Sequence, residues 1–277
     1  MSVTDLGRLL DAAATSAALD LARINGELLV AYQPIVRVHD RSIAGFEALM
    51  RWQHPERGLI PAADFIPVAQ QSGQIVWLGW HVMASAVQQL AAWNEQLGHN
   101  GLSLNVNLCV MQLGAPCFVT DVDDLLHING VSAGQLTVEI PATELANPAS
   151  LRKPISALRD LGVRIAMDDV GIKGAPIRVL DDLEFDTLKL DRTLVSAVAA
   201  GDASARRLLL HLTSMAAERC LVTVAEGIEK PAELALLTEL GCELAQGYAL
   251  GRPLMAPQAD ALVRKMAHRS IMSLQSR

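Results

Sequence analysis

The sequence lacks two features that place a protein in or across a membrane. No apolar stretch reaches the roughly 18–20 residues that a membrane-spanning helix needs, and the longest candidate, residues 75–87, contains His81. The first residues include Asp5, Arg8 and Asp11, where a signal peptide has an unbroken apolar core. We therefore expect no membrane span and a cytoplasmic location.

Metal-ligand spacings and positive charge are also scarce. The four cysteines lie far apart without a C-x-x-C pair, and the seven histidines show no ligand spacing, so a disulfide framework or a zinc site is not expected. The net charge is -7 and no basic tract occurs, which argues against binding of DNA or RNA. A phosphate ligand would have to be held by metal ions and a few placed cations.

Apolar residues are plentiful and fall into short runs. They make up 51% of the 277 residues, which is enough for one large core. From the third run onward, consecutive runs are separated by segments long enough for a helix, a pattern typical of an α/β barrel of the TIM type. The eight runs are residues 28–38, 43–52, 102–109, 136–141, 164–170, 187–192, 221–227 and 244–248.

One connection departs from that barrel. Only the four residues "HDRS" (39–42) join the first two runs, too few for a parallel crossover, so this pair should be an antiparallel hairpin. The predicted fold is a modified TIM (β/α)8 barrel with one antiparallel strand, over residues 25–277. Residues 1–24 are expected to form a helical leader or linker, through which a regulatory domain or protein partner could act.

Seven successive strands, from the second onward, carry an acid, an amide or a lysine. In a barrel the carboxyl ends of the strands converge on one mouth, where barrel chemistry occurs. One such carboxylate more often caps a helix, but seven successive strands with such residues indicate a site. The residues are Glu47, Asn107, Glu139, Asp168, Asp169, Lys189, Asp191, Glu226, Glu229 and Gln246.

So many carboxylates need cations, because like charges raise one another's pKa. Oxygen ligands of this kind suit Mg²⁺, Mn²⁺ or Ca²⁺, and adjacent Asp168 and Asp169 could bridge two metals about 3.5–4 Å apart. The alternative for Asp169 is a helix cap. Lysine with carboxylates and Mg²⁺ also describes enolase-type proton abstraction. That superfamily has a sizeable domain before its barrel, whereas only residues 1–27 precede the first strand here, so we set it aside.

Eight segments, in this order along the chain, carry a family resemblance: "YQPIVRV", "GFEALMRWQHPERGLIP", "FIPVA", "NLCVMQL", "LGVRIAMDD", "TLKLDR", "VAEGIE" and "GCELAQGYALGRP". Together they resemble the EAL domain of bacterial cyclic di-GMP phosphodiesterases, from about residue 25 to residue 265. The resemblance implies an enzyme that attacks one phosphodiester of cyclic di-GMP with a metal-activated water and opens the ring to linear pGpG.

The resemblance also implies a role for each site residue. The two-metal site would take Mg²⁺ or Mn²⁺, Ca²⁺ would inhibit, and the chain would form a homodimer through elements next to residues 170–177. The implied metal ligands are Glu47, Asn107, Glu139, Asp168, Asp169 and Asp191. The implied catalytic residues are Lys189, which would hold or polarise the water, with Glu226 and Glu229. The implied substrate contacts are Gln33, Arg51 and Gln246.

The loop after the double aspartate departs from the family. The family has Phe-Gly-Thr-Gly-Tyr-Ser-Ser-Leu, whereas residues 170–177 read "VGIKGAPI" and keep only the first glycine, so hydroxyls that would fix the loop are lost. The family's Glu-x-Thr-Glu run is "EIPA" here, with Ala142 in the place of the loop's anchor. A bulge could bring Glu144 into that place, but the spacing from Glu139 to Asp168 favours plain substitution.

Three functions therefore stay open at this point. An active phosphodiesterase is favoured because no catalytic residue is missing, and loss of the loop's support would reduce its activity, typically ~10–100-fold. The altered loop also fits a receptor that binds cyclic di-GMP without cleaving it. A protein-interaction module that uses neither nucleotide nor metal is the third reading.

Overall fold

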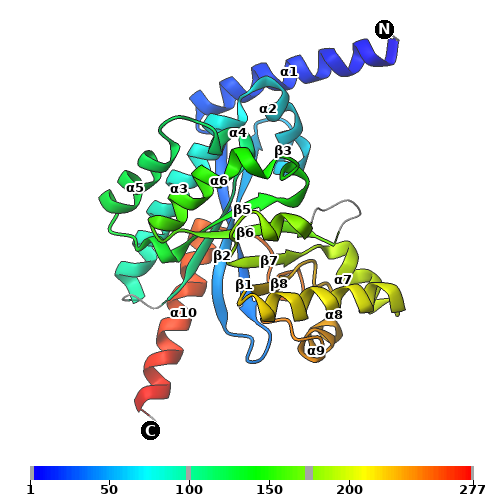
Figure 1. Ribbon diagram of the computed structural model, residues 1–277. Coiled ribbons are helices and arrows are strands. Elements are labelled where there is room, and N and C mark those ends of the chain that lie inside the picture. The colour runs from blue at the N-terminus through cyan, green and yellow to red at the C-terminus, as the bar shows by residue number, and fades with distance from the viewer. Residues whose placement is uncertain (1–2, 98–100, 172–176, 276–277) are drawn as a thin grey trace.

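The computed structural model describes residues 3–97, 101–171 and 177–275, and the side chains of residues 13–97, 101–171 and 177–266 (Figure 1). The altered loop's residues 172–176 lie outside this part of the chain. No helix among the described residues combines the length and apolarity needed to cross a bilayer.

Within the described residues, eight strands close into a barrel, which confirms the predicted fold. The order around the barrel is β1-β2-β4-β5-β6-β7-β8-β9, and β9 returns to β1. The barrel strands are β1 (Leu28–Arg37), β2 (Ile43–His54), β4 (Ser103–Asn107), β5 (Leu136–Pro141), β6 (Arg164–Val170), β7 (Thr187–Leu190), β8 (Val222–Ala225) and β9 (Leu244–Ala245).

Strand β1 is the reversed strand that the short "HDRS" connection predicts. It pairs antiparallel with both of its barrel neighbours, β2 and β9. The other neighbouring strands of the barrel, from β2 through β4 to β9, pair in parallel. Two short strands, β3 (Gly58–Pro61) and β10 (Leu254–Met255), extend the sheet at β2 and β1 and were not predicted. Strand β9 is shorter than the expected 244–248, and Gly247, beyond its end, packs directly on the backbone of Ile228.

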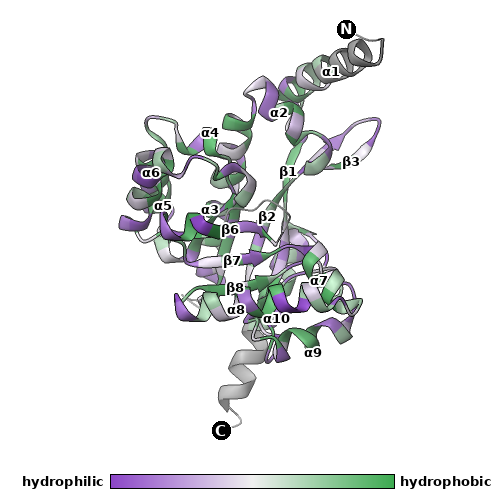
Figure 2. Ribbon diagram, turned by 45° about the vertical axis from the view of Figure 1, so that its right-hand side comes forward, coloured by the Kyte–Doolittle hydropathy of each residue, from purple (hydrophilic) through white to green (hydrophobic). Residues whose placement is uncertain are grey.

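Helices surround the barrel, and Figure 1 shows α1 running outward from it toward the N-terminus. In Figure 2 hydrophilic colouring is strong on the outer helix α6, and hydrophobic colouring follows much of β1, β2 and β8. The helices are α1 (Val3–Asn25), α2 (Ile66–Ser72), α3 (Ile75–Leu97), α4 (Val110–Leu113), α5 (Phe118–Ile128), α6 (Pro148–Asp160), α7 (Arg192–Ala199), α8 (Ala203–Glu218), α9 (Pro231–Glu239) and α10 (Ala256–Gln275). Short 3-10 turns are η1 (Ala62–Asp64), η2 (Ala133–Gln135), η3 (Ala142–Glu144) and η4 (Ile177–Asp181).

Helix boundaries follow from local residue chemistry. Helix α9 begins at Pro231, whose missing N–H and fixed φ suit the first helical position, and Gly241 with φ 76° follows its end. Helix α8 begins after Asp202, whose carboxylate accepts the backbone N–H groups of Ser204 and Ala205. The proline start and glycine stop of α9 can be read from the sequence alone.

An aromatic cluster joins α3 to the strands that carry the reversed pairing. The ring of Trp93 lies 5.3 Å from that of Tyr32 on β1 and 4.7 Å from that of Phe46 on β2. Helix α10 closes over the cluster, because Asp260 Oδ1 accepts the indole N–H of Trp93 at 2.7 Å and the amide of Gln89 at 2.9 Å. These contacts hold β1 and β2, and hence Glu47, in place behind the mouth.

We predict that Asp260→Ala lowers the free energy of unfolding by about 1–3 kcal/mol, because the buried N–H of Trp93 loses its acceptor. Asp260→Asn keeps the accepting oxygen and should stay near the unsubstituted protein. Urea denaturation of the metal-free chain measures both variants, and equal loss in the two would assign the effect to charge instead of to the hydrogen bond.

Candidate metal centre in the barrel mouth

Strand alternation brings polar side chains from neighbouring strands into the barrel. In the parallel register Glu47 lies beside Asn105, and Asn107 lies beside Glu139. Asn105 and Asn107 are two residues apart, so both face the same side of β4. The sequence analysis singled out Asn107 and missed Asn105, although the same alternation would have found it.

Lys189 on β7 is the cation at the centre of this arrangement. Its side chain is 1% exposed, and its Nζ lies 2.7 Å from a carboxylate oxygen of Glu139 and 2.7 Å from one of Glu226. The Asp168 and Glu47 carboxylates follow at 3.4 Å and 3.6 Å. Strands β2, β5 and β6, and the residue directly after β8, therefore each direct a carboxylate at one buried ammonium group.

Amide side chains hold two of these carboxylates in position. Asn105 Nδ2 donates to Glu139 at 2.7 Å. Glu47 accepts from Asn107 Nδ2 at 2.6 Å and from Gln246 Nε2 at 2.7 Å, one bond on each carboxylate oxygen. With their nitrogens used in this way, the carbonyl oxygens of Asn107 and Gln246 remain as acceptors or ligands.

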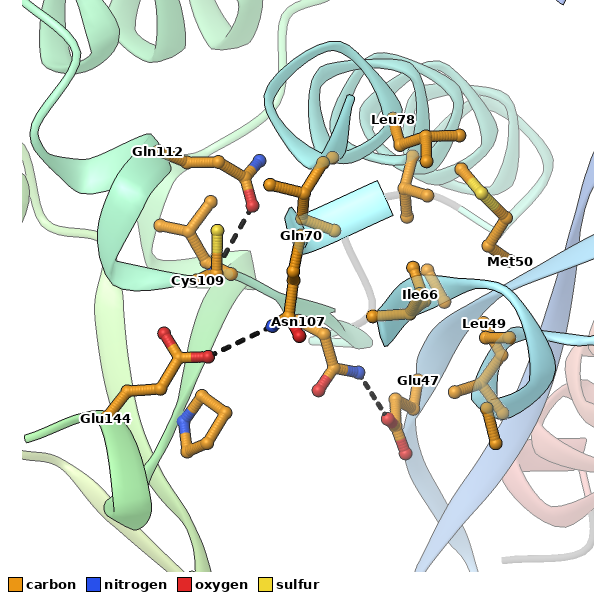
Figure 3. Close-up of a pocket in the computed structure, with 18 of the residues that line it drawn as sticks. Glu47, Leu49, Met50, Ile66, Gln70, Leu78, Asn107, Cys109, Gln112 and Glu144 are labelled. Atoms are coloured by element: carbon orange, nitrogen blue, oxygen red, sulfur yellow. Dashed lines mark hydrogen bonds between the residues drawn. The ribbon is translucent and has the colours of Figure 1, made fainter. Parts of the chain in front are cut away.

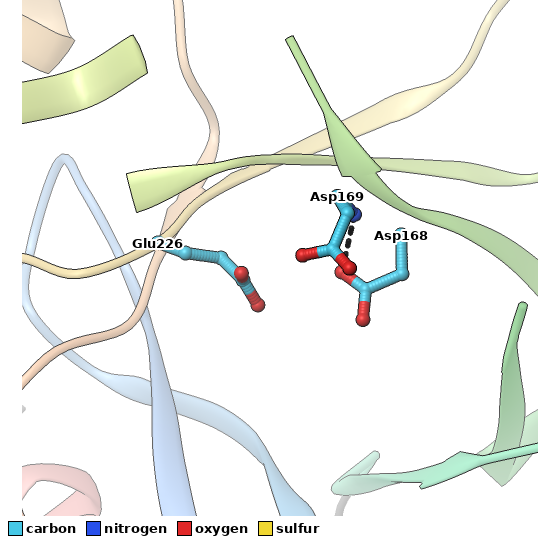
Figure 4. A group of neighbouring side chains, drawn as sticks. All are labelled: Asp168, Asp169 and Glu226. Atoms are coloured by element: carbon cyan, nitrogen blue, oxygen red, sulfur yellow. Dashed lines mark hydrogen bonds between the residues drawn. The ribbon is translucent and has the colours of Figure 1, made fainter. Parts of the chain in front are cut away.

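A bulge in β6 turns both members of the double aspartate toward the mouth. The register of β6 against β7 shifts between Met167 and Val170, and Asp169 adopts a left-handed φ of 58°. In a regular strand, adjacent side chains point to opposite faces. Here the carboxylates of Asp168, Asp169 and Glu226 each offer an oxygen within 4.8 Å of the other two (Figure 4).

The proton affinities of the carboxylates reflect an excess of negative charge. Burial raises the pKa of Glu139 well above its usual value. Lys189 lowers this pKa, but the negative charges of Glu47 and Asp168 raise it further. Burial and the Asp168 carboxylate likewise raise the pKa of Asp169 and bring that of Glu226 to about 8, against the opposing effect of Lys189. Bound cations would relieve this repulsion.

Lys189 and Glu47 behave in the opposite way. Burial favours the neutral amine, but the surrounding carboxylates, Asp168 first, outweigh it and raise the pKa of Lys189 well above its usual value. Burial also favours a protonated Glu47, but Lys189 and the bonds from Gln246 and Asn107 outweigh it and lower the pKa of Glu47. The two groups are therefore held as an ammonium and a carboxylate.

The residues present fit a hard divalent cation. The donor set is made of carboxylate and amide oxygens, which Mg²⁺, Mn²⁺ and Ca²⁺ prefer. Gln246 Oε1 is moreover a buried side-chain acceptor without a hydrogen-bond partner among the described residues. An acceptor left open beside Glu47 suits a water or an N–H group of a ligand in the mouth.

The remaining expected site residues lie around this cluster. Gln33 is buried opposite Glu47 in the β1–β2 register and donates to the carbonyl of Gly251 at 3.2 Å. Arg51 is half-buried, donates to the carbonyl of Met50 at 2.7 Å, and burial lowers its pKa.

Asp191 and Glu229 occupy different surroundings. Asp191 is buried and caps α7, where it accepts the backbone N–H of Thr193 at 2.8 Å and its hydroxyl. Glu229 is exposed, and its backbone N–H donates to Glu233 at 2.8 Å. The structure thus gathers Glu226 into the carboxylate cluster and leaves Glu229 on the surface of the molecule.

A cavity of about 460 Å³ opens beside the cluster. Asp169 is among its lining residues. Figure 3 shows Glu47 and Asn107 on the barrel side of the cavity, and apolar residues such as Ile66 on α2 and Leu78 on α3. The volume is in the range of small-molecule sites.

Two pairs of residues near the mouth were not predicted. Glu144 joins Gln70 at the cavity. The Arg252 guanidinium lies 4.6 Å over the ring of Tyr248, whose side chain is exposed. Neither pair can be recognised in the sequence. Gln70 and Glu144 belong to different elements far apart in the chain, and Tyr248 and Arg252 lie in the irregular segment after β9.

This fold and site place the chain in a known family. Residues 16–253 match the EAL domain, and the chain belongs to the EAL domain family. Among curated relatives, an uncharacterized signaling protein of Caulobacter vibrioides is 39% identical over 241 residues, which cover 86% of this chain and 28% of the relative. The cyclic di-GMP phosphodiesterase NbdA of Pseudomonas aeruginosa is 34% identical over 239 residues, 86% of this chain and 30% of NbdA. This chain therefore spans less than a third of the length of either relative.

Solved structures agree with this assignment. The PaMucR phosphodiesterase in complex with c-di-GMP is similar with a TM-score of 0.83 at 31% identity, covering 89% of this chain and 99% of that one. The EAL enzyme Bd1971 with cAMP and cyclic-di-GMP bound has a TM-score of 0.88 at 25% identity, covering 94% of this chain and 72% of that one.

We predict that the stability of the metal-free protein falls as the pH rises from about 4.5 to about 8. The folded-state pKa of Glu226 is raised from 4.5 to about 8, so the folded form keeps a proton that the unfolded form releases within this window. The slope should be on the order of 1 kcal/mol per pH unit. Denaturation in chelator at several pH values measures it.

Glu226→Gln should make this dependence less steep, since an amide does not titrate, and the raised pKa values of Glu139 and Asp169 leave a smaller slope of the same sign. Glu218→Gln, at an exposed position on α8, is the matched control and should keep it. A slope that survives unchanged in Glu226→Gln would remove Glu226 as its source.

Proposed function

We propose that the chain hydrolyses cyclic di-GMP to linear pGpG in a reaction that requires Mg²⁺ or Mn²⁺. The observation that carries this proposal is the bulged double aspartate, which brings Asp168 and Asp169 together with Glu226 beside Lys189. The likeness to the NbdA and PaMucR phosphodiesterases supports the choice of substrate.

Each group in the mouth has a part in this reaction. Bound divalent cations would neutralise charge on the phosphate and lower the pKa of a water. The residues that would hold them are Glu47, Asn107, Glu139, Asp168, Asp169 and Asp191. Glu226 would complete the network around the attacking water, whereas the implied role of Glu229 stays a prediction, because its side chain is exposed.

Lys189 would act as a cation and not as a proton acceptor. Its carboxylate neighbours keep the ammonium form, so it can hold the attacking water and the phosphate by charge. Arg51 would bind a phosphate of the substrate, and Gln33 and Gln246 would line the pocket on the side of β1 and β9. The homodimer and the link through residues 1–24 stay predictions.

The test is incubation of the purified chain with cyclic di-GMP and Mg²⁺ or Mn²⁺, followed by chromatographic separation of the products. We expect linear pGpG, and we expect Glu47→Ala and Asn107→Ala to abolish it because each removes a metal-holding side chain. Glu218→Ala, on the surface of α8, is the control and should retain turnover. Undiminished cleavage in Glu47→Ala or in excess chelator would contradict the assignment of the site.

Binding is separated from cleavage by calorimetry with Ca²⁺ in place of Mg²⁺. Arg51→Ala should weaken nucleotide binding while Arg207→Ala, at an exposed position of α8, should not. Binding without any product in Mg²⁺ and Mn²⁺ would favour the receptor reading instead.

We further propose that turnover is reduced by the altered loop after Asp169. Two observations support plain substitution at Ala142. Strand β5 runs to Pro141 without a register shift against β6, and both carboxylate oxygens of Glu144 are engaged, with Gln70 and Val110. Ala142 is itself fully buried.

A weakly supported Asp169 should make the second metal bind weakly. We therefore expect activity to keep rising with metal beyond the concentration that saturates an ordinary Mg²⁺ site, and Mn²⁺ to exceed Mg²⁺, since Mg²⁺ demands near-ideal octahedral geometry. Titration of each metal in the product assay measures this. Full activity at low Mg²⁺ would show that the loop is held by other means.

A further inference from the structure

Glu144 faces the same cavity as the side chains that would hold the metals. Glu47, Asn107 and Asp169 contribute to this cavity from the barrel side, and Glu144 contributes from η3, directly after β5 (Figure 3). Its side chain is half-buried. A carboxylate at such a place would be expected to need fixed donors.

Two donors from separate elements meet this carboxylate. The backbone N–H of Val110 donates to Glu144 Oε2 at 2.8 Å. The side-chain amide of Gln70, on α2, donates to Glu144 Oε1 at 3.2 Å. Glu144 thereby joins β5, α4 and α2 at one point.

The bond to Val110 acts on the segment that follows Asn107. Val110 is the first residue of α4, and the first N–H groups of a helix have no acceptor within the helix. A carboxylate at this end is favourable because its negative charge is attracted by the partial positive charge of those N–H groups. Asn107 lies three residues earlier, so the bond fixes the end of β4.

The two amides before Val110 are held as well. The N–H of Leu108 donates to the carbonyl of Glu139 at 2.9 Å, and the N–H of Cys109 donates to Gln112 at 3.1 Å. Three consecutive backbone N–H groups after Asn107 thus have three acceptors on different elements. Among them, Glu144 is the acceptor that also connects to α2.

Helix α2 in turn is tied to α1. Gln74, between α2 and α3, donates to the carbonyl of Ser16 at 3.0 Å and to the carboxylate of Asp20 at 2.7 Å. The side-chain hydroxyl of Ser16 donates back to Gln74 at 2.9 Å. Displacement of α1 would therefore move α2, and with it the side-chain amide of Gln70 that donates to Glu144.

We infer that Glu144 is a positioning residue that fixes the Asn107 end of β4 against α2, and so orients Asn107 toward the metal. The inference rests on the proposed function in treating Asn107 as a metal ligand. Glu144 lies two places beyond Ala142 and acts on β4, not in the place of the family's loop anchor.

The first measurement needs no substrate and no metal. Hydrogen exchange of the Val110 amide, followed by NMR on the full chain, should show strong protection, and Glu144→Ala should remove it. Glu144→Gln should restore it, because the amide oxygen accepts from Val110 while the amide nitrogen donates to a turned Gln70. Exchange of Val110 at the solvent rate in the unsubstituted protein would overturn the inference even if Glu144→Ala failed to fold.

The second measurement is calorimetric binding of Mn²⁺ without nucleotide. Glu144→Ala should bind Mn²⁺ about 10–100-fold more weakly, the scale for loss of a group that supports a metal ligand, and Glu144→Gln should stay near the unsubstituted protein. Gln70→Ala keeps the Val110 bond, so it should keep that amide's protection and lose less affinity. Unchanged Mn²⁺ affinity in folded Glu144→Ala would refute the positioning role.

The two measurements separate this inference from the proposed function. A chain that binds no Mn²⁺ would refute the metal site, and the exchange of Val110 would still decide whether Glu144 holds the end of β4. A chain that binds Mn²⁺ but makes no pGpG leaves the positioning role supported if the affinity series is as expected.

Discussion

A buried ammonium group surrounded by carboxylates is the interaction on which the rest of the site depends. Lys189 is 1% exposed and lies within 3.6 Å of oxygens of Glu47, Glu139, Asp168 and Glu226. Neither partner could be buried alone without a penalty of several kcal/mol. The barrel supplies the geometry, because four strand ends meet at one mouth. The carboxylates still outnumber the ammonium, as the raised pKa values of Glu139 and Glu226 show, and divalent cations would offset this excess of negative charge.

The distorted backbone of β6 adds a second aspartate to this charge cluster. A regular strand would direct Asp168 and Asp169 to opposite faces, and Asp169 would face the surrounding helices. The bulge and the left-handed φ of Asp169 instead direct both carboxylates to the mouth. Aspartate tolerates this conformation better than most residues with a side chain do. A left-handed backbone at a residue other than glycine is often found at functional sites. Here it lies at Asp169, which together with Asp168 and Glu226 belongs to the proposed metal site.

Much of the fold and part of the site could be predicted from the sequence. The apolar runs gave the barrel strands, and the four-residue connection after β1 gave the reversed strand, because both depend on local pattern and length. Strand-end position also predicted the mouth cluster, but it could not separate Glu226, which joins the cluster, from Glu229, which is exposed. Side-chain direction beyond a strand end is set by turn geometry. The bond from Val110 to Glu144 spans 34 residues, and no local pattern announces it.

The reversal of β1 changes the side on which the chain enters the barrel. In a barrel of parallel strands, the segment before the first strand arrives at the face opposite the site. Here Leu28, at the start of β1, pairs with Trp52 near the end of β2, so the start of β1 lies at the mouth. Helix α1, which ends at Asn25, is therefore delivered to the rim that carries the carboxylates. A shift of this helix would reach the carboxylate rim directly, without having to travel through the barrel wall.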